Sequence, residues 1–182
     1  MRRLIYSVAT SLDGYIAGPK GEFDWIMMDP EIDFASLMSR FDAVIMGRKT
    51  FAAMQGMGSG HSSPLQTIVV SRTLKAAKYP GVVILQHNLK KAITQLKQAS
   101  GKDIWLFGGG QLFQSLLKLG LVDGIELGIM PVLLGKGIPF LPAPAAKTQL
   151  QMTRNHTYPK TGIVWLEYTV LPAQTAKNKS KK

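Results

Sequence analysis

Two segments about sixty residues apart combine glycine with groups that can bind phosphate. Residues 47–50 read Gly-Arg-Lys-Thr and close an apolar run, and residues 108–110 are three glycines between an apolar run and a helical pattern. Glycine lets backbone N–H groups approach an anion closely, and the N-terminus of a helix adds partial positive charge. Together the two segments predict a site for a pyrophosphate and a further phosphate.

The two segments match neither of the familiar phosphate-binding fingerprints. The sequence contains no G-x-G-x-x-G and no G-x-x-x-x-G-K-[ST]. A tight turn that packs a helix on its strand explains three glycines equally well when they are taken alone. Their pairing with the cations of residues 47–50 favours a binding site.

Composition indicates one folded domain and argues against several kinds of site. Of the 182 residues, 46% are apolar and 18% are charged, which is typical of a globular chain with a substantial core. The chain has no cysteine, so disulfides and thiolate metal sites are excluded. The histidines His61, His87 and His156 share no ligand spacing, and we predict no metal site. No serine lies in a nucleophile-elbow pattern, which argues against hydrolase chemistry.

The net charge of +11 suits either anionic small molecules or nucleic acid. Four lysines and no acid lie in residues 173–182, so residues 1–172 carry +7 of that charge. We predict that residues 173–182 form a disordered basic tail and that nucleic acid is not the main partner. The short apolar run after Met1 is better explained as a strand than as a signal peptide, and no run is long enough to span a membrane. A cytoplasmic protein is the expectation.

Strand-like and helix-like runs alternate through most of the chain. This order predicts a single α/β domain, residues 1–172, with a mostly parallel central sheet and flanking helices. Asp29-Pro30 is a favourable helix start, followed by an apolar stripe of Phe34, Leu37, Met38 and Phe41. Predicted strands are residues 3–9, 42–46, 67–70 and 82–85; predicted helices are 50–55, the run from Asn88 to Gly101 and the run from the glycines to Gly120; predicted loops are 11–23 and 56–64.

The last third of the sequence changes character. Residues 125–134, 150–158 and 162–171 all favour strands, and no helical pattern separates them. We therefore expect a C-terminal antiparallel hairpin that extends the parallel sheet.

The order of these motifs resembles the dihydrofolate reductase superfamily over residues 3–171. Residues 44–51 (Val-Ile-Met-Gly-Arg-Lys-Thr-Phe) and 107–113 (Phe-Gly-Gly-Gly-Gln-Leu-Phe) are similar to segments of dihydrofolate reductases. Residues 11–17 (Ser-Leu-Asp-Gly-Tyr-Ile-Ala) and 121–140 are similar to the branch that contains the reductase domain of riboflavin biosynthesis. Gly124 departs from that branch, where an acid commonly follows the Val-Asp pair, and no deaminase segment with zinc ligands is present in the sequence.

The resemblance implies NADPH as the cofactor. It also implies a non-prolyl cis peptide between Gly108 and Gly109. Arginine and a hydroxyl at residues 71–72 suit the 2′-phosphate that distinguishes NADPH from NADH. The implied cofactor-binding residues are Ala9 and Ile16 for the nicotinamide carboxamide, Gly47, Arg48, Lys49 and Thr50 for the phosphates, Ser71 and Arg72 for the 2′-phosphate, and Gly108, Gly109, Gly110, Gln111 and Leu112 for the pyrophosphate.

The resemblance places the substrate on the nicotinamide side of the sheet. Dihydrofolate reductases use a carboxylate on the first helix, and Asp33 is the nearest match, with Glu31 as a competitor. Both acids can also simply favour a helix N-terminus. Asp13 and Trp25 are further candidates for the substrate pocket, although a turn residue and a core aromatic explain them equally well.

The leading hypothesis is an NADPH-dependent reductase of a small nitrogen heterocycle, most like 5-amino-6-(5-phosphoribosylamino)uracil reductase. Lys136 and Arg154 are the candidates for a substrate phosphate. Dihydrofolate reduction through Asp33 is one alternative, and a non-catalytic nucleotide- or nucleic-acid-binding protein is another. The resemblance leaves a homodimer open as the assembly.

Overall fold

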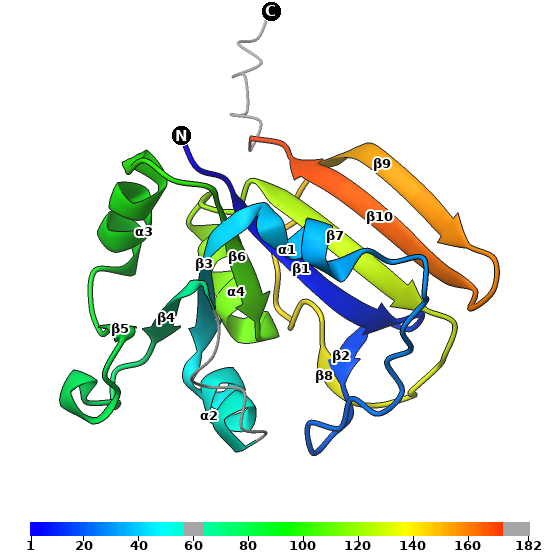
Figure 1. The fold of residues 1–182 in the computed structure, drawn as a ribbon, viewed down its shortest axis with the longest axis horizontal. Coiled ribbons are helices and arrows are strands. Elements are labelled where there is room, and N and C mark those ends of the chain that lie inside the picture. The colour runs from blue at the N-terminus through cyan, green and yellow to red at the C-terminus, as the bar shows by residue number, and fades with distance from the viewer. Residues whose placement is uncertain (57–63, 173–182) are drawn as a thin grey trace, which may run out of the picture.

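The computed structural model describes residues 1–56 and 64–172. The predicted tail, and nearly all of the predicted loop 56–64, lie outside the described residues. The core element is an eight-stranded sheet (Figure 1). Its strands, in spatial order, are β5 (Val82–Leu85), β4 (Gln66–Val70), β3 (Phe41–Gly47), β6 (Asp103–Gly108), β1 (Leu4–Ser11), β7 (Gly124–Met130), β10 (Ile163–Val170) and β9 (Leu150–Tyr158).

The first six strands of this order are parallel to one another. β1 pairs in parallel with both β6 and β7, and β3 pairs in parallel with both β4 and β6. β10 is antiparallel to β7 and to β9, so the predicted C-terminal hairpin forms one end of the sheet. The predicted fold class, a mostly parallel α/β sheet with an antiparallel hairpin, is confirmed.

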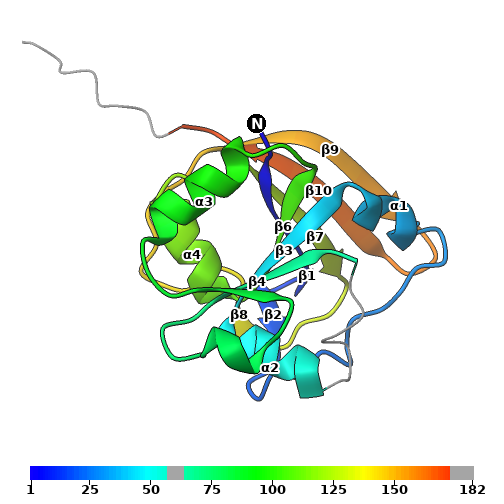
Figure 2. The same cartoon turned by 60° about the vertical axis from the view of Figure 1, so that its left-hand side comes forward.

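Helices cover both faces of the sheet. Figure 2 shows α3 (Leu89–Gln98) and α4 (Gly110–Lys118) on one side and α1 (Phe34–Ser39) on the other. The main core lies under α3 and α4, where the Tyr6 ring stacks on Phe113 with 4.0 Å between ring centroids. On the opposite face, Phe51 of α2 (Arg48–Gly56) packs into a smaller apolar cluster with Val44. A short 3₁₀ helix, η2 (Ala76–Lys78), precedes β5.

The predicted start of the first helix at Asp29-Pro30 was wrong. The helix begins at Phe34, and Asp33 is its N-cap, with a carboxylate oxygen that accepts the Ser36 N–H at 2.9 Å. Asp29 is buried and accepts hydrogen bonds from the Glu31 N–H and the Thr161 hydroxyl. Its tertiary partner on the β9–β10 turn outweighs its local preference for a helix N-cap.

The predicted apolar stripe divides between two elements. Phe41 is buried in β3, whereas Phe34, Leu37 and Met38 lie on α1, which buries none of its side chains. The helical spacing of these residues was therefore only partly a helix signal. α1 is a short helix that is not fully packed on the sheet.

One strand of a second, two-stranded sheet lies inside the region predicted as the loop 11–23. β2 (Tyr15–Ala17) pairs antiparallel with β8 (Ile138–Pro139). A side chain at Gly137 would collide with the Ala17 carbonyl oxygen, so glycine permits this close approach. The sequence gives little sign of such short strands, because their partners are far apart in the chain.

Candidate functional site

The predicted phosphate-binding segments meet at one edge of the sheet. β3, β4 and β6 are neighbours and parallel, so their carboxyl ends lie together. Gly47 is the register partner of Val70, which Ser71 and Arg72 follow, and Met46 is the register partner of Gly108. In open α/β sheets this edge is where ligands bind.

Two helices begin at the same place. α2 starts at Arg48 and α4 starts at Gly110, with Gly109 as its N-cap. A Cβ atom built on Gly109 would lie 3.6 Å from the Thr50 hydroxyl oxygen, so the two segments face each other directly. Two helix N-termini that converge on one space favour an anion there.

The three glycines have different reasons to lack a side chain. Gly108 has φ of +141°, which L side chains rarely adopt, and the Gly108–Gly109 peptide is cis as the resemblance implies. A Cβ atom on Gly110 would lie only 2.5 Å from the Pro139 carbonyl oxygen. Gly110 therefore serves the packing of α4 against the segment around β8. A Cβ atom on Gly109 would make only an ordinary van der Waals contact with Thr50, so the fold itself does not require glycine there.

Three cations surround this edge without an acidic partner. Arg48, Lys49 and Arg72 are exposed, and within residues 1–56 and 64–172 none of them forms an ion pair. Ser71 is buried, and its hydroxyl oxygen accepts the N–H groups of Thr73 and Leu74 at 3.2 and 3.1 Å. The Ser71 hydroxyl therefore shapes the turn that presents Arg72.

Other predicted cofactor residues adjoin this edge. Gln111 is exposed on the first turn of α4, whereas the Leu112 side chain belongs to the main core and its N–H donates to the Gly109 carbonyl at 3.0 Å. Ala9 lies near the carboxyl end of β1, and Ile16 lies on β2; both are partly exposed. The structure thus brings the backbone of residue 9 and of residues 47–50, 71–72 and 108–112 to the same edge of the sheet.

Asp13 holds a loop in place. Its carboxylate accepts the Ser11 hydroxyl at 2.6 Å and the N–H groups of Leu134 and Gly135 at 3.1 and 2.7 Å. These hydrogen bonds, led by that from Ser11, lower the pKa of Asp13 below its ordinary value. These contacts are those of a turn residue, which was the predicted alternative to a substrate-binding role for Asp13.

The remaining predicted side chains also have structural partners. Trp25 is half-buried and donates its indole N–H to the Glu22 carbonyl at 3.2 Å. Asp33 is exposed at the cap of α1, and Glu31 pairs with Lys160 at 3.0 Å.

The two cationic residues predicted to bind a substrate phosphate lie on different elements. Lys136 is exposed in the turn before β8. Arg154 lies on the edge strand β9, 3.8 Å from Glu167.

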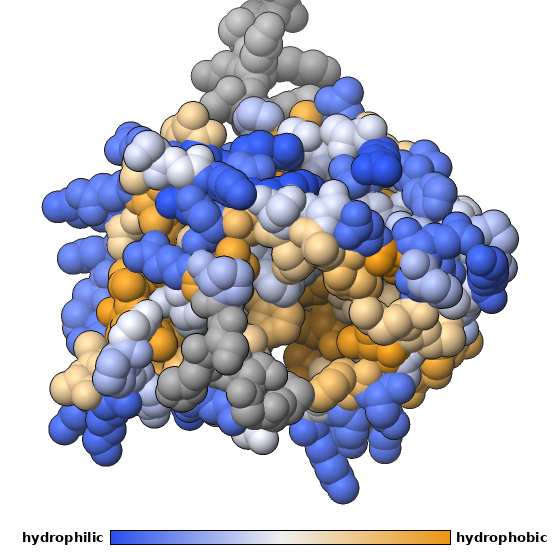
Figure 3. Space-filling model, viewed as in Figure 1, coloured by the Kyte–Doolittle hydropathy of each residue, from blue (hydrophilic) through white to orange (hydrophobic). Residues whose placement is uncertain are grey.

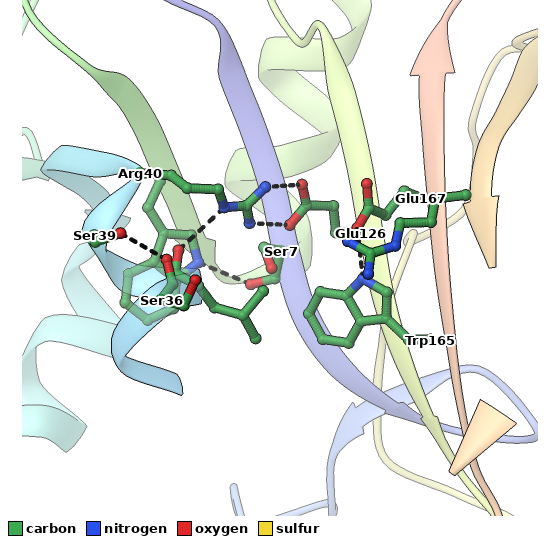
Figure 4. Close-up of polar contacts among 10 residues, drawn as sticks. Ser7, Ser36, Ser39, Arg40, Glu126, Trp165 and Glu167 are labelled. Atoms are coloured by element: carbon green, nitrogen blue, oxygen red, sulfur yellow. Dashed lines mark hydrogen bonds and ion pairs between the residues drawn. The ribbon is translucent and has the colours of Figure 1, made fainter. Parts of the chain in front are cut away.

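Sequence reasoning missed an ion pair under α1 between the half-buried Arg40 and the buried Glu126. Figure 4 shows Arg40, at the C-terminus of α1, against Glu126 of β7. The guanidinium donates two hydrogen bonds to the carboxylate, at 2.9 and 2.7 Å, and these raise the pKa of Arg40. Glu126 is a single acid in a run of apolar residues, a pattern that requires a buried partner. That pattern was the available signal.

A hollow opens on the face that carries α1. Figure 3 shows it beside β2 and below α1 in this view, with apolar residues on its floor and on the β2 side. Across residues 1–56 and 64–172, no group of three His, Cys, Asp or Glu side chains could hold a metal ion. The helices of these residues are too short or too polar to cross a bilayer.

The strand order, the antiparallel hairpin and the glycine-lined edge define a dihydrofolate reductase-like α/β domain. The sequence profile of the RibD C-terminal domain matches residues 2–163, and the chain belongs to that family.

Individual proteins are also similar to this chain. The uncharacterized protein YyaP of Bacillus subtilis is 33% identical over 179 residues, which cover 92% of this chain and 94% of that protein. A crystal structure of a proposed riboflavin biosynthesis protein from Shewanella sp. PV-4 superposes with a TM-score of 0.80 at 26% identity, over 94% of this chain and all of that chain. Dihydrofolate reductase from Enterococcus faecalis, complexed with NADP(H) and RAB-propyl, shares the fold alone: the TM-score is 0.67 at 16% identity, over 93% of this chain and 97% of that one.

Proposed function

We propose that this chain is an NADPH-dependent reductase of a small nitrogen heterocycle, most like 5-amino-6-(5-phosphoribosylamino)uracil reductase. Membership of the RibD C-terminal domain family supports a reductase of this kind. The main structural support is the convergence of α2 and α4 on one space, with Gly109 facing Thr50 across it.

The residues at this edge suit a phosphorylated dinucleotide. Thr50 and the N–H groups at the starts of α2 and α4 would hold the pyrophosphate, because they supply hydrogen-bond donors and partial positive charge. Gly109 has no side chain and would leave room for the ligand. Arg72, exposed and free of acidic partners within the described chain, would bind the 2′-phosphate. Lys49 and Arg48 would add charge at the mouth of the site.

The bound nicotinamide would supply the hydride, and this chain would supply position and a dry environment. The backbone at Ala9 and Ile16 would orient the carboxamide, since Ala9 lies near the carboxyl end of β1 and β2 follows that strand after a short turn. The substrate would then occupy the apolar hollow that opens beside β2, below α1 in the view of Figure 3.

Two measurements test this proposal. We expect the purified protein to bind NADPH stoichiometrically in a tryptophan-fluorescence titration, and to bind NADH more weakly. We then expect NADPH oxidation with the riboflavin-pathway aminopyrimidine in preference to dihydrofolate. Absence of NADPH binding, or equal affinity for the two cofactors, would contradict the proposal. Binding of nucleic acid with steep salt dependence would instead support the nucleic-acid alternative.

A further inference from the structure

The face of the sheet under α1 carries a polar row across four strands. Ser7 of β1 is the register partner of Glu126 on β7, which is in turn the partner of Glu167 on β10. Glu167 is the partner of Arg154 on β9. Because alternate residues of each strand face the other way, into the main core, these side chains share the α1 face.

The two neighbouring carboxylates are not equally compensated. Arg40 donates two hydrogen bonds to Glu126, whereas Arg154 stands 3.8 Å from Glu167 and is largely exposed. The Trp165 indole N–H donates to Oε1 of Glu167 at 3.0 Å, and Oε2 has no partner in the described part of the chain. Like charges opposite each other on adjacent strands are unfavourable, so this second carboxylate favours a ligand with N–H donors.

An aromatic side chain lies next to this carboxylate. Trp165 is the register partner of Gly128, and its ring atoms would lie 3.6 Å from a Cβ atom there. Glycine thus gives the indole room, and Figure 4 shows it reaching from β10 across β7 towards β1. On β1 the register partner of Gly128 is Ala9, the residue proposed to face the nicotinamide.

The helix above this floor leaves it incompletely covered. α1 buries none of its side chains, and its apolar residues Phe34, Leu37 and Met38 are exposed or only half-buried. Trp165 and Ala9 are also only partly buried. A flat ligand between α1 and the sheet would cover apolar surface on both sides.

We propose that Trp165 and Glu167 are specificity-determining residues of the substrate site. This inference rests on the function proposed above. The ring of a planar nitrogen heterocycle packs against the exposed part of the Trp165 indole. An N–H donor of the same ring is accepted by Oε2 of Glu167. A heterocycle without such donors, or one that places an anionic group here, binds weakly.

Two probes test the donor requirement directly. 2,4-Diaminopyrimidine carries amino donors, and 2,4-dimethoxypyrimidine is a flat analogue without them. By calorimetry, wild type should prefer the diamino probe, and Glu167→Gln should reduce affinity for it by about ten-fold while leaving the dimethoxy probe unchanged. Glutamine keeps an oxygen for the Trp165 N–H, so the indole stays in place.

The aromatic wall is tested separately. Trp165→Ala should weaken both probes by about ten-fold, and Trp165→Phe should retain most of the affinity. Circular dichroism and an unchanged thermal midpoint of unfolding show that each variant is folded.

Three results overturn the proposal. They are a donor preference that survives Glu167→Gln, a preference that is lost instead in Asp33→Asn, and no binding of either probe to wild type. The probe titrations are made without cofactor, so a failure to bind NADPH would refute the proposed function alone.

Discussion

Gly109 faces the hydroxyl of Thr50 across the space between α4 and α2, and a Cβ atom added at Gly109 would lie 3.6 Å from the Thr50 Oγ1 atom. That separation is an ordinary van der Waals contact, so the protein itself can accommodate a methyl group there. A ligand that occupies the same space cannot. The relationship therefore separates the needs of the fold from those of the cofactor.

We predict that Gly109→Ala abolishes NADPH binding while the thermal midpoint of unfolding stays near wild type. Gly110→Ala is the matched control, because its methyl group would lie 2.5 Å from the Pro139 carbonyl oxygen and should lower the midpoint. Calorimetry and a fluorescence titration check both variants. A folded Gly109→Ala protein with normal NADPH affinity would show that this glycine serves packing alone.

Arg72→Ala should weaken NADPH binding by about 1.5–3 kcal/mol, the usual worth of a hydrogen bond to a charged group. This corresponds to roughly ten- to a hundredfold in affinity. NADH lacks the 2′-phosphate, so its affinity should hardly change. Lys75→Ala, a nearby exposed cation outside the proposed site, is the control for general charge effects. An equal loss for both cofactors argues against the assignment.

Asp33→Asn should preserve α1, because asparagine is as good an N-cap as aspartate and can still accept the Ser36 N–H. NADPH affinity should stay near wild type. If Asp33 serves as the acid for a pterin, turnover of dihydrofolate should fall by about 10²–10⁴. Turnover of the aminopyrimidine should survive if the enzyme works without this carboxylate, and we expect survival. Undiminished dihydrofolate reduction in the variant would exclude a folate role for Asp33.

The hydrogen bonds to Asp13 should make stability depend on pH. They lower its pKa in the folded state, so the protein binds the proton less readily than the unfolded chain does. The contribution is fully present above the ordinary aspartate pKa of about 4 and is lost as the pH falls through the lowered value. Asp13→Asn should therefore be less stable than wild type at neutral pH, and this difference should shrink in acid. Urea unfolding across that pH range measures it; a constant difference would contradict the prediction.

Local pattern in the sequence determined most of the regular elements. The residue ranges of β5 and β9 agree with the predicted ones, and α4 buries Leu112, Phe113 and Leu116 as its spacing indicates. Short-range rules suffice here because period and turn chemistry are properties of neighbouring residues. The glycine and cation motifs likewise predicted an anion site, and the parallel strands of an α/β sheet bring such motifs to one edge.

Tertiary contacts decided the rest. Asp29 does not cap a helix as predicted, because its carboxylate accepts a hydrogen bond from Thr161, more than a hundred residues away. The helix α1 begins instead at Phe34. Arg40 and Glu126 form an ion pair although they are 86 positions apart in the sequence, and no local pattern specifies such a pair. The sequence also could not show that Gly110 serves packing, because Pro139 approaches it only in the folded chain. Sequence alone fixes what a segment prefers, whereas burial and distant partners decide which preference is satisfied.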